Sequence, residues 1–435
     1  MELCSTNNDS IRVSWREAVL HGIASDGGLY IPTELPKFSK DEIKSLRSCS
    51  LAELAYTISR RFLGTETPPD LLHQICTESF TFQAPLHRLD DRTFVLELFH
   101  GPTCAFKDFG ARFMARLFRH FWGDNAQPLT VLVATSGDTG SAVANAFFDP
   151  SDRAPIRVAI LYPRGKVSAV QRKQMTTLGH NVTAFEVDGT FDDCQALVKR
   201  ALRDDKLLAA TALTSANSIN ISRLLPQMFY YAHAVLQLAD MGTPIFSVPS
   251  GNLGNLTGGL LAHTCGFTAH HFIAACNANA SFPQFMASGA FTPHKSCETI
   301  SNAMDVGNPS NFYRILSLFH SRHEAMSPLL SSLSVSDQET RTAMRDYYKR
   351  FGYILDPHTA VGAYALDRYR AAHQTEAPGV ILSTAAPAKF GATVSETLGV
   401  APAIPSQLQK TLDKEEHFVP LTNSYAELFS KLVGA

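Results

Sequence analysis

Residues 93–122 read TFVLELFHGPTCAFKDFGARFMARLFRHFW, and they contain one complete strand–loop–helix unit. The first six residues are mostly apolar, with β-favouring side chains, which predicts a buried strand over 93–98. From about 108 to 122, apolar residues recur with the period of a helix, which predicts an amphipathic helix. Between the two lies a Gly-Pro turn, and a lysine stands directly before the predicted helix.

The same alternation of short apolar runs and amphipathic stretches continues along the chain after this unit. Further strands are predicted at 129–134, 156–162, 181–187, 244–249 and 380–383. Nearly continuous apolar strands separated by helices indicate parallel sheets covered by helices on both faces. The sequence therefore predicts an α/β fold.

The expected organisation is a mainly helical N-terminal region over 1–90, followed by two parallel-sheet α/β lobes. One lobe is expected over 91–240, and the other, with C-terminal helices, over 241–435. Helix starts are marked by the Ser-x-x-Glu capping-box spacing, in which each side chain satisfies a free backbone amide. This spacing occurs at Ser39 with Glu42, Ser50 with Glu53, and Ser336 with Glu339.

Composition narrows the class of protein. The 435 residues are 45% hydrophobic and 18% charged, which is typical of a globular protein with a substantial core. With 38 basic and 40 acidic residues, the chain shows no excess of positive charge that would favour nucleic acid or an anionic membrane. Eight cysteines without a C-x-x-C pair predict reduced thiols and a cytoplasmic location. We expect no signal peptide and no membrane span.

The loop 100–110, HGPTCAFKDFG, carries the strongest chemical signal. Lys107 stands between two phenylalanines and before a helix N-terminus that Asp108 could cap. Desolvation and the helix dipole both disfavour the ammonium form, and a neutral amine is what a Schiff base requires. The alternative is an ordinary surface lysine beside an N-cap, and spacing alone favours that alternative.

Two glycine-containing turns follow predicted strands. The loop 249–259, PSGNLGNLTGG, suits a phosphate, because backbone amides and a helix N-terminus can approach an anion there. The turn 135–140, TSGDTG, could hold a carboxylate, and Asp138 could accept a proton from a cofactor hydroxyl. The alternatives are a plain packing turn for the first and N-capping by Asp138 or Thr139 for the second.

Together these stretches resemble the threonine synthase family, pyridoxal-phosphate enzymes of fold type II, and in particular its longer bacterial and fungal branch. Four stretches carry the resemblance, and the order and spacing of the sequence match the family from residue 27 to about residue 400. The stretches are HGPTCAFKDFG at 100–110, TSGDTG at 135–140, PSGNLGNLT at 249–257 and STAAPAKF at 383–390. The resemblance implies the two-lobed fold of that enzyme group.

The resemblance also implies a role for each matching residue. Lys107, the catalytic residue, forms the Schiff base with pyridoxal 5'-phosphate and afterwards moves protons. The implied cofactor-binding residues are Lys107, Asp138, Gly251, Asn252, Leu253, Gly254, Asn255 and Thr384. Thr384 is expected to face the pyridine nitrogen. The implied substrate-binding residues are Ser136, Gly137, Thr139, Asn220, Arg223, Asn308 and Ser310. No metal site is expected.

The implied reaction is O-phospho-L-homoserine plus water giving L-threonine and phosphate, the last step of threonine biosynthesis. The expected partner is therefore this small-molecule substrate, with no nucleic acid and no membrane, and the chain is expected to be a monomer or a homodimer. The sequence departs from the family pattern at Ala386, where a histidine is usual. Cys104 replaces a usual leucine, and Leu253 and Asn255 replace a usual Phe and Asp.

Two alternatives stay open at this stage. A related phospho-lyase or dehydratase would use the same lysine loop but release a 2-oxo acid, and Ala386 keeps this alternative in play. A non-catalytic protein that binds a phosphorylated metabolite would keep the glycine-rich loop but would not need Lys107. The presence of Lys107 within its whole motif argues against a non-catalytic protein.

Overall fold

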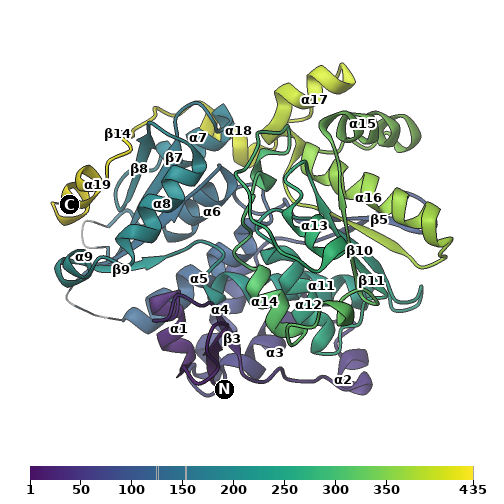
Figure 1. Cartoon of the computed structure of the whole chain (residues 1–435), viewed down its shortest axis with the longest axis horizontal. Coiled ribbons are helices and arrows are strands. Elements are labelled where there is room, and N and C mark those ends of the chain that lie inside the picture. The colour runs from purple at the N-terminus through teal and green to yellow at the C-terminus, as the bar shows by residue number, and fades with distance from the viewer. Residues whose placement is uncertain (124, 126, 152–153, 435) are drawn as a thin grey trace.

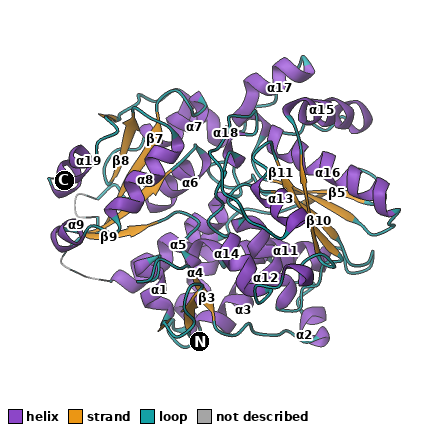
Figure 2. Cartoon of the chain, in the orientation of Figure 1, coloured by secondary structure: helices purple, strands orange, loops and turns teal. Residues whose placement is uncertain are grey.

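The computed structural model describes residues 1–123, 125, 127–151 and 154–434, which form three sheets surrounded by helices (Figure 1). Figure 2 shows two large groups of strands on opposite sides of the molecule, with helices around and between them. The α/β fold predicted from the sequence is confirmed. None of the described helices is long and apolar enough to cross a membrane.

The larger sheet has six strands in the order β12-β11-β10-β13-β5-β4. Neighbouring strands are parallel, except that β4 runs antiparallel to β5. Its strands are β4 (Leu86–Arg88), β5 (Thr93–Glu97), β10 (Ile245–Pro249), β11 (His271–Cys276), β12 (Leu330–Ser334) and β13 (Gly379–Ser383). Every residue of β10, β11 and β13 is buried, as expected for parallel strands covered on both faces.

A first group of helices surrounds the six-stranded sheet and fills the space between the two large sheets (Figure 2). They are α5 (Lys107–Trp122), α10 (Ile221–Leu224), α11 (Gln227–Gln237), α12 (Gly254–Thr264), α13 (Ser281–Ser288), α14 (Phe312–Leu318), α15 (Asp337–Phe351), α16 (Pro357–His373) and α17 (Gly391–Leu398). Three short 3-10 helices are η1 (Asn302–Met304), η2 (His323–Ala325) and η3 (Pro387–Phe390). The capping box predicted at Ser336 and Glu339 is confirmed at the start of α15.

The smaller sheet has five parallel strands in the order β14-β8-β7-β6-β9. Its strands are β6 (Leu129–Ala134), β7 (Ile156–Pro163), β8 (Val182–Val187), β9 (Ala212–Ser215) and β14 (Val419–Leu421). Its helices are α6 (Asp138–Phe147), α7 (Ala169–Thr176), α8 (Phe191–Ala201), α9 (Asp205–Ala210), α18 (Ser406–Leu412) and α19 (Tyr425–Val433). In Figure 1 this sheet lies on the left and the six-stranded sheet on the right.

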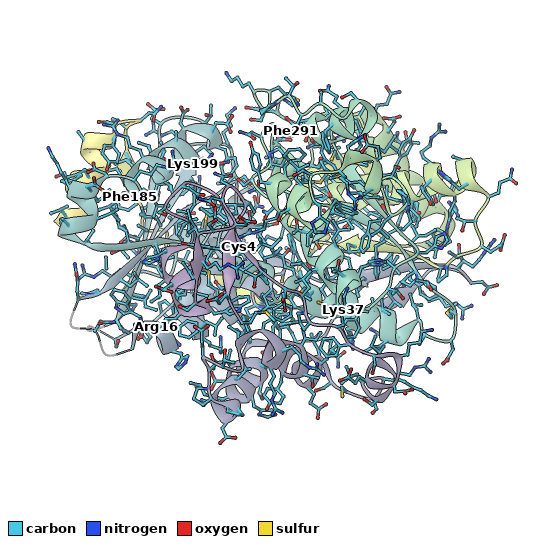
Figure 3. All side chains as sticks on the ribbon, turned by 60° about the horizontal axis from the view of Figure 1, so that its bottom comes forward. Cys4, Arg16, Lys37, Phe185, Lys199 and Phe291 are labelled. Carbon is cyan, nitrogen blue, oxygen red and sulfur yellow. The ribbon has the colours of Figure 1, made fainter. Side chains whose placement is uncertain are left out.

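The N-terminal region is mainly helical, as expected, and also contains a small antiparallel sheet in the order β2-β1-β3. In Figure 3, Cys4 of this region lies near the centre of the view, between Phe185 on β8 and Lys37. The elements are β1 (Leu3–Ser5), β2 (Arg12–Val13), α1 (Trp15–His21), β3 (Tyr30–Pro32), α2 (Lys40–Ser45), α3 (Leu51–Leu63) and α4 (Pro69–Ser79). Both capping boxes predicted here are confirmed.

Sheet membership does not follow the boundaries expected at 90 and 240. Strand β5, placed by the sequence in the first lobe, pairs with β13 in the six-stranded sheet. Strand β14, near the C-terminus, pairs with β8 in the five-stranded sheet. The reason is that strand pairing is a long-range contact, which the local pattern of apolar residues does not encode. The division into three regions stays a prediction.

Candidate active site

The loop that carries Lys107 is fixed at the carboxyl ends of β5 and β13 by its pairing with the segment after β13. Strands β5 and β13 pair up to Glu97 and Ser383, and an isolated bridge joins Ala105 to Ala385. The amide of Phe106 then donates to the carbonyl of Thr384 at 2.8 Å. Lys107 and Thr384 are therefore held close together at the carboxyl end of parallel strands, where α/β proteins place ligands.

Lys107 is the first residue of α5 and lines a cavity of about 110 Å³. Burial lowers the pKa of its amine to about 8, while Asp138 opposes this shift and Arg223 and Lys389 add to it. The ammonium lies 5.4 Å from the centre of the Phe106 ring. A lysine in this state has a substantial neutral fraction near physiological pH, which nucleophilic amine chemistry requires.

Asp108 does not cap α5, contrary to what the sequence suggested. The helix start at Phe106 has no side-chain cap. The Asp108 carboxylate instead accepts hydrogen bonds from the amide of Thr103 at 2.8 Å and from its hydroxyl at 2.7 Å. Asp108 is fully buried, and it closes the loop that presents Lys107.

The glycine-rich loop after β10 leaves the N-terminus of α12 open toward the cavity. Leu253 adopts a left-handed conformation with φ of 59°, and the helix has no side-chain cap. A Cβ on Gly251 would lie 2.7 Å from Cα of Met304, so only glycine fits against this neighbouring backbone. The uncapped amides of the first turn are free donors, and the helix dipole favours an anion at this end.

Two buried donors beside the loop lack a protein partner. The Asn255 side-chain oxygen accepts from the hydroxyls of Tyr230 at 2.7 Å and Tyr231 at 2.8 Å, whereas its Nδ2 has no partner in the described structure. The Nε of Arg223 is likewise buried without one. Both residues line the cavity. Orphaned donors beside an open helix N-terminus fit a group that carries a phosphate, as pyridoxal phosphate does.

In the TSGDTG turn, the hydroxyl of Thr135 accepts hydrogen bonds from the backbone amides at the start of α6, so the side chains of Ser136, Asp138 and Thr139 are left to line the cavity. The Thr135 hydroxyl accepts from the amides of Gly137 at 2.9 Å and Gly140 at 2.8 Å. Neither Asp138 nor Thr139 is a cap, so the N-capping alternative is wrong. Asp138 instead pairs with Lys389 at 2.7 Å and accepts from Gln171 at 2.9 Å.

The structure brings most of the predicted site residues to one cavity. Those that line it are Lys107, Ser136, Asp138, Thr139, Arg223, Gly251, Asn252, Leu253, Gly254, Asn255 and Thr384. A larger cavity of about 840 Å³ shares Ser136 and Phe191 with it. The described part of the chain contains no cluster of His, Cys, Asp or Glu suited to a metal.

Four predicted substrate residues do not line the cavity. Gly137 has φ of 136° and packs against the Gln171 side chain. The Asn220 side chain is fully buried and already satisfied, because it donates to the carbonyls of Val19 and Ser215 and accepts from Ser222. Asn308 is exposed, and the Ser310 amide donates to Oδ1 of Asn252 at 2.5 Å. Ser310 therefore contacts the glycine-rich loop through Asn252 and does not line the cavity.

Sequence reasoning missed several residues at the site. Ser218 lines the cavity and accepts from Asn252 Nδ2 at 2.8 Å. Lys389 and Gln171 hold Asp138, although they come from distant segments. Lys389 lies within the stretch 383–390, which carried part of the family resemblance, and Ser218 lies two residues before Asn220, which the resemblance named; this was the available signal. Nothing local to Gln171 pointed to the site.

Ala386 does not line the cavity. It is buried in a small apolar cluster with Cys104, Ala388 and Leu408, and it is not among the described residues that line the cavity. Its amide donates to the carbonyl of Cys104 at 3.0 Å. Two departures from the family pattern, at 104 and 386, therefore belong to one apolar contact.

Comparisons with known proteins identify the family of the chain. The family model described as "Pyridoxal-phosphate dependent enzyme" matches residues 78–385. Models of the threonine synthase N terminus and C-terminal part match residues 2–80 and 359–433. The fold and the family model together define a pyridoxal-phosphate-dependent enzyme of fold type II.

Individual relatives narrow this class. Threonine synthase from Escherichia coli is 42% identical over 95% of each chain, and that from Schizosaccharomyces pombe is 34% identical over 91% of this chain and 88% of its own. The crystal structure of the E. coli enzyme matches with a TM-score of 0.92 at 40% identity, covering 100% of both chains. Pyridoxal-phosphate-bound threonine synthase from Brucella melitensis also gives a TM-score of 0.92, at 34% identity, covering 100% of this chain and 99% of its own. The chain belongs to the threonine synthase family, and its cofactor is pyridoxal phosphate.

Proposed function

We propose that Lys107, Asp138, Arg223 and the loop 251–255 carry out the reaction of the threonine synthase family in this chain. That reaction converts O-phospho-L-homoserine and water into L-threonine and phosphate. The single observation that supports the assignment is the position of Lys107, whose pKa is lowered to about 8, in a cavity shared with an open helix N-terminus.

Each group has a distinct task in this proposal. Bound pyridoxal phosphate supplies an electron sink for charge that develops on the substrate carbons. Gly251, Asn252, Leu253, Gly254 and Asn255 hold the cofactor phosphate through the amides of the α12 N-terminus, aided by Asn255 Nδ2. Lys107 carries the cofactor on its amine. Once released, Lys107 removes the proton on the substrate's α-carbon.

Arg223 is the best placed group for the substrate phosphate. Its guanidinium is 4% exposed and takes part in no ion pair within the described structure, and burial lowers its pKa to about 10. A buried cation without a carboxylate partner is costly, and an incoming phosphate would remove that cost. Ser218 lines the same cavity. Thr384, Ser136 and Thr139 remain for the pyridine nitrogen and the substrate carboxylate.

The reaction test follows the products of one substrate. The purified protein is loaded with pyridoxal phosphate, O-phospho-L-homoserine is added, and threonine, 2-oxobutyrate and phosphate are quantified. Threonine and phosphate in equal amounts support the proposal, and 2-oxobutyrate in place of threonine would indicate the lyase or dehydratase alternative. Borohydride reduction followed by peptide mass mapping should place the cofactor on Lys107, with Lys389, the other buried lysine nearby, unmodified.

The cellular location, the partner and the oligomeric state of the chain are also proposals. All eight cysteines are free thiols, which supports a cytoplasmic location. The expected partner is the small-molecule substrate, and the assembly is a monomer or a homodimer. Light scattering of the purified holoenzyme distinguishes these two states.

A further inference from the structure

A buried ion pair joins the two large sheets beside the reactive lysine. Lys389 lies in η3, the next element after β13 of the six-stranded sheet, whereas Asp138 begins α6, the next element after β6 of the five-stranded sheet. Their charged atoms are 2.7 Å apart, and the side chains are 0% and 4% exposed. The Lys389 ammonium is therefore fixed against Asp138, the carboxylate that acts on Lys107.

The Lys389 ammonium is held in place by a second bond. It donates to the carbonyl of Thr103 at 2.9 Å, and Thr103 is fixed in turn by the Asp108 carboxylate. Gln174 donates to the same carbonyl at 3.1 Å. Asp138 is also held by two donors, Lys389 and Gln171. Neither charge can turn toward another partner without breaking this network.

The charged groups around these side chains form a small set. Asp138, Arg223 and Lys389 act on Lys107. Burial alone would raise the pKa of Asp138, but Lys389 first and then Lys107 hold it well below its ordinary value. Lys389 also acts on Cys104, whose pKa is raised by burial to about 12, and on the buried Asp108, which Arg112 faces as well.

We propose that Lys389 is a positioning residue that balances the charge of Asp138, so that Lys107 is left without a carboxylate of its own and reacts as the neutral amine. Without Lys389, the Asp138 carboxylate would have Lys107 as its remaining lysine partner and would stabilise the ammonium form. This inference rests on the proposed role of Lys107. It gives the buried ion pair a task beyond joining the two sheets.

The test measures the pH dependence of cofactor capture by the cofactor-free chain. The Lys107 amine condenses with the aldehyde carbon of pyridoxal phosphate, with loss of water, and the visible absorption that develops gives a rate at each pH. The rate should rise with pH to a midpoint set by deprotonation of the amine. The cofactor's own titration is common to all variants, so differences in midpoint belong to the protein.

Two single variants should shift this midpoint in opposite directions. Lys389→Met removes the balancing cation and should raise the midpoint by about one pH unit or more, the lower range for an opposite charge a few Å away. Asp138→Asn removes the carboxylate and should lower the midpoint. Lys199→Met, which removes an exposed lysine from α8 (Figure 3), is the matched control and should leave it unchanged.

The double variant separates charge balance from a merely structural clamp. Removal of one partner leaves a buried unpaired charge and destabilises the fold, whereas removal of both does not leave one. The Asp138→Asn/Lys389→Met variant should therefore restore the midpoint to within about half a pH unit of the wild type. A Lys389→Met midpoint equal to the wild type, or a double variant that keeps the full upward shift, would overturn the proposal.

Failure of this inference is distinguishable from failure of the proposed function. If Lys107→Ala still captured the cofactor on a lysine, the assignment of Lys107 would be wrong whatever the midpoints of the other variants. If Lys107→Ala lost capture but Lys389→Met left the midpoint unchanged, only the role of Lys389 would be wrong. Far-UV circular dichroism of every variant at each pH checks that the compared proteins are folded.

Discussion

Gly251→Ala should weaken cofactor binding strongly, because the new methyl group has no space. A Cβ at position 251 would lie 2.7 Å from Cα and 3.3 Å from the carbonyl carbon of Met304, and 3.2 Å from the carbonyl oxygen of Ala303. These are backbone atoms, so the loop and residues 303–304 must move apart. Displacement of this size in a packed region costs about 1–3 kcal/mol.

The cost appears in binding because the loop must keep its amides aimed at one phosphate. If the full cost falls on the bound state, the dissociation constant for pyridoxal phosphate should rise by roughly 5- to 150-fold, at about 1.4 kcal/mol per tenfold. The assay is titration of the cofactor-free protein, followed by the visible absorption of the bound cofactor. Because the contact is with backbone, trimming the neighbouring side chain in Gly251→Ala/Met304→Ala should not restore affinity.

The matched control is Gly391→Ala at the start of α17. Its Cβ would meet its nearest neighbour, Cγ of Pro402, at 3.9 Å, an ordinary contact, and its φ of −54° suits alanine. This variant should bind the cofactor as the wild type does. If the dissociation constant of Gly251→Ala for pyridoxal phosphate lay within about twofold of the values for the wild type and for Gly391→Ala, the argument that close backbone packing shapes this loop would be refuted.

Three further predictions concern charge and capping. Burial lowers the pKa of Lys107 from 10.5 to about 8, so between these pH values the unfolded chain binds more protons at this residue than the folded chain does. The free energy of unfolding of the wild type should therefore rise relative to that of Lys107→Met as the pH increases from about 8 to 10.5. Urea unfolding of both proteins without cofactor measures this difference. Arg223→Met should raise the KM for O-phospho-L-homoserine by about tenfold or more without loss of unfolding free energy, since it removes a buried unpaired cation; an unchanged KM with lower stability would contradict this. Ser336→Ala should cost about 1 kcal/mol in unfolding free energy, whereas Ser424→Ala, at an N-cap without a side-chain bond, should cost almost nothing.

Local features of the fold were predictable because short-range chemistry determines them. The strand at 93–97 and the helix from 107 to 122 were predicted to within a residue or two, and the capping boxes were confirmed. Residues 219–238 do not form one continuous helix, since α10 ends at Leu224 and α11 begins at Gln227. Pro226 lies at this break, where its missing amide donor cannot continue a helix.

Contacts between distant segments could not be predicted from the sequence in this way. No pattern near residue 419 indicates that a three-residue strand will pair with β8, more than two hundred residues earlier in the chain. The role of Asn220 was equally hidden. The family resemblance implied a substrate-binding role for it, but packing against α1 turns its amide to the carbonyl of Val19. A polar residue in a suitable motif becomes a ligand or a structural bond depending on contacts made by distant segments.

The balance of charge in the cavity connects these observations. Among the charged groups that act on Lys107, two cations, Arg223 and Lys389, stand against one carboxylate, Asp138. Such an excess of buried positive charge is unfavourable in the empty protein, and burial accordingly lowers the pKa of Lys107 and of Arg223. Phosphate groups on cofactor and substrate each bring the negative charge that relieves it. The same excess charge that weakens the empty cavity thus favours the two anionic ligands, while pairing with Lys389 keeps the Asp138 carboxylate from stabilising the ammonium form of Lys107.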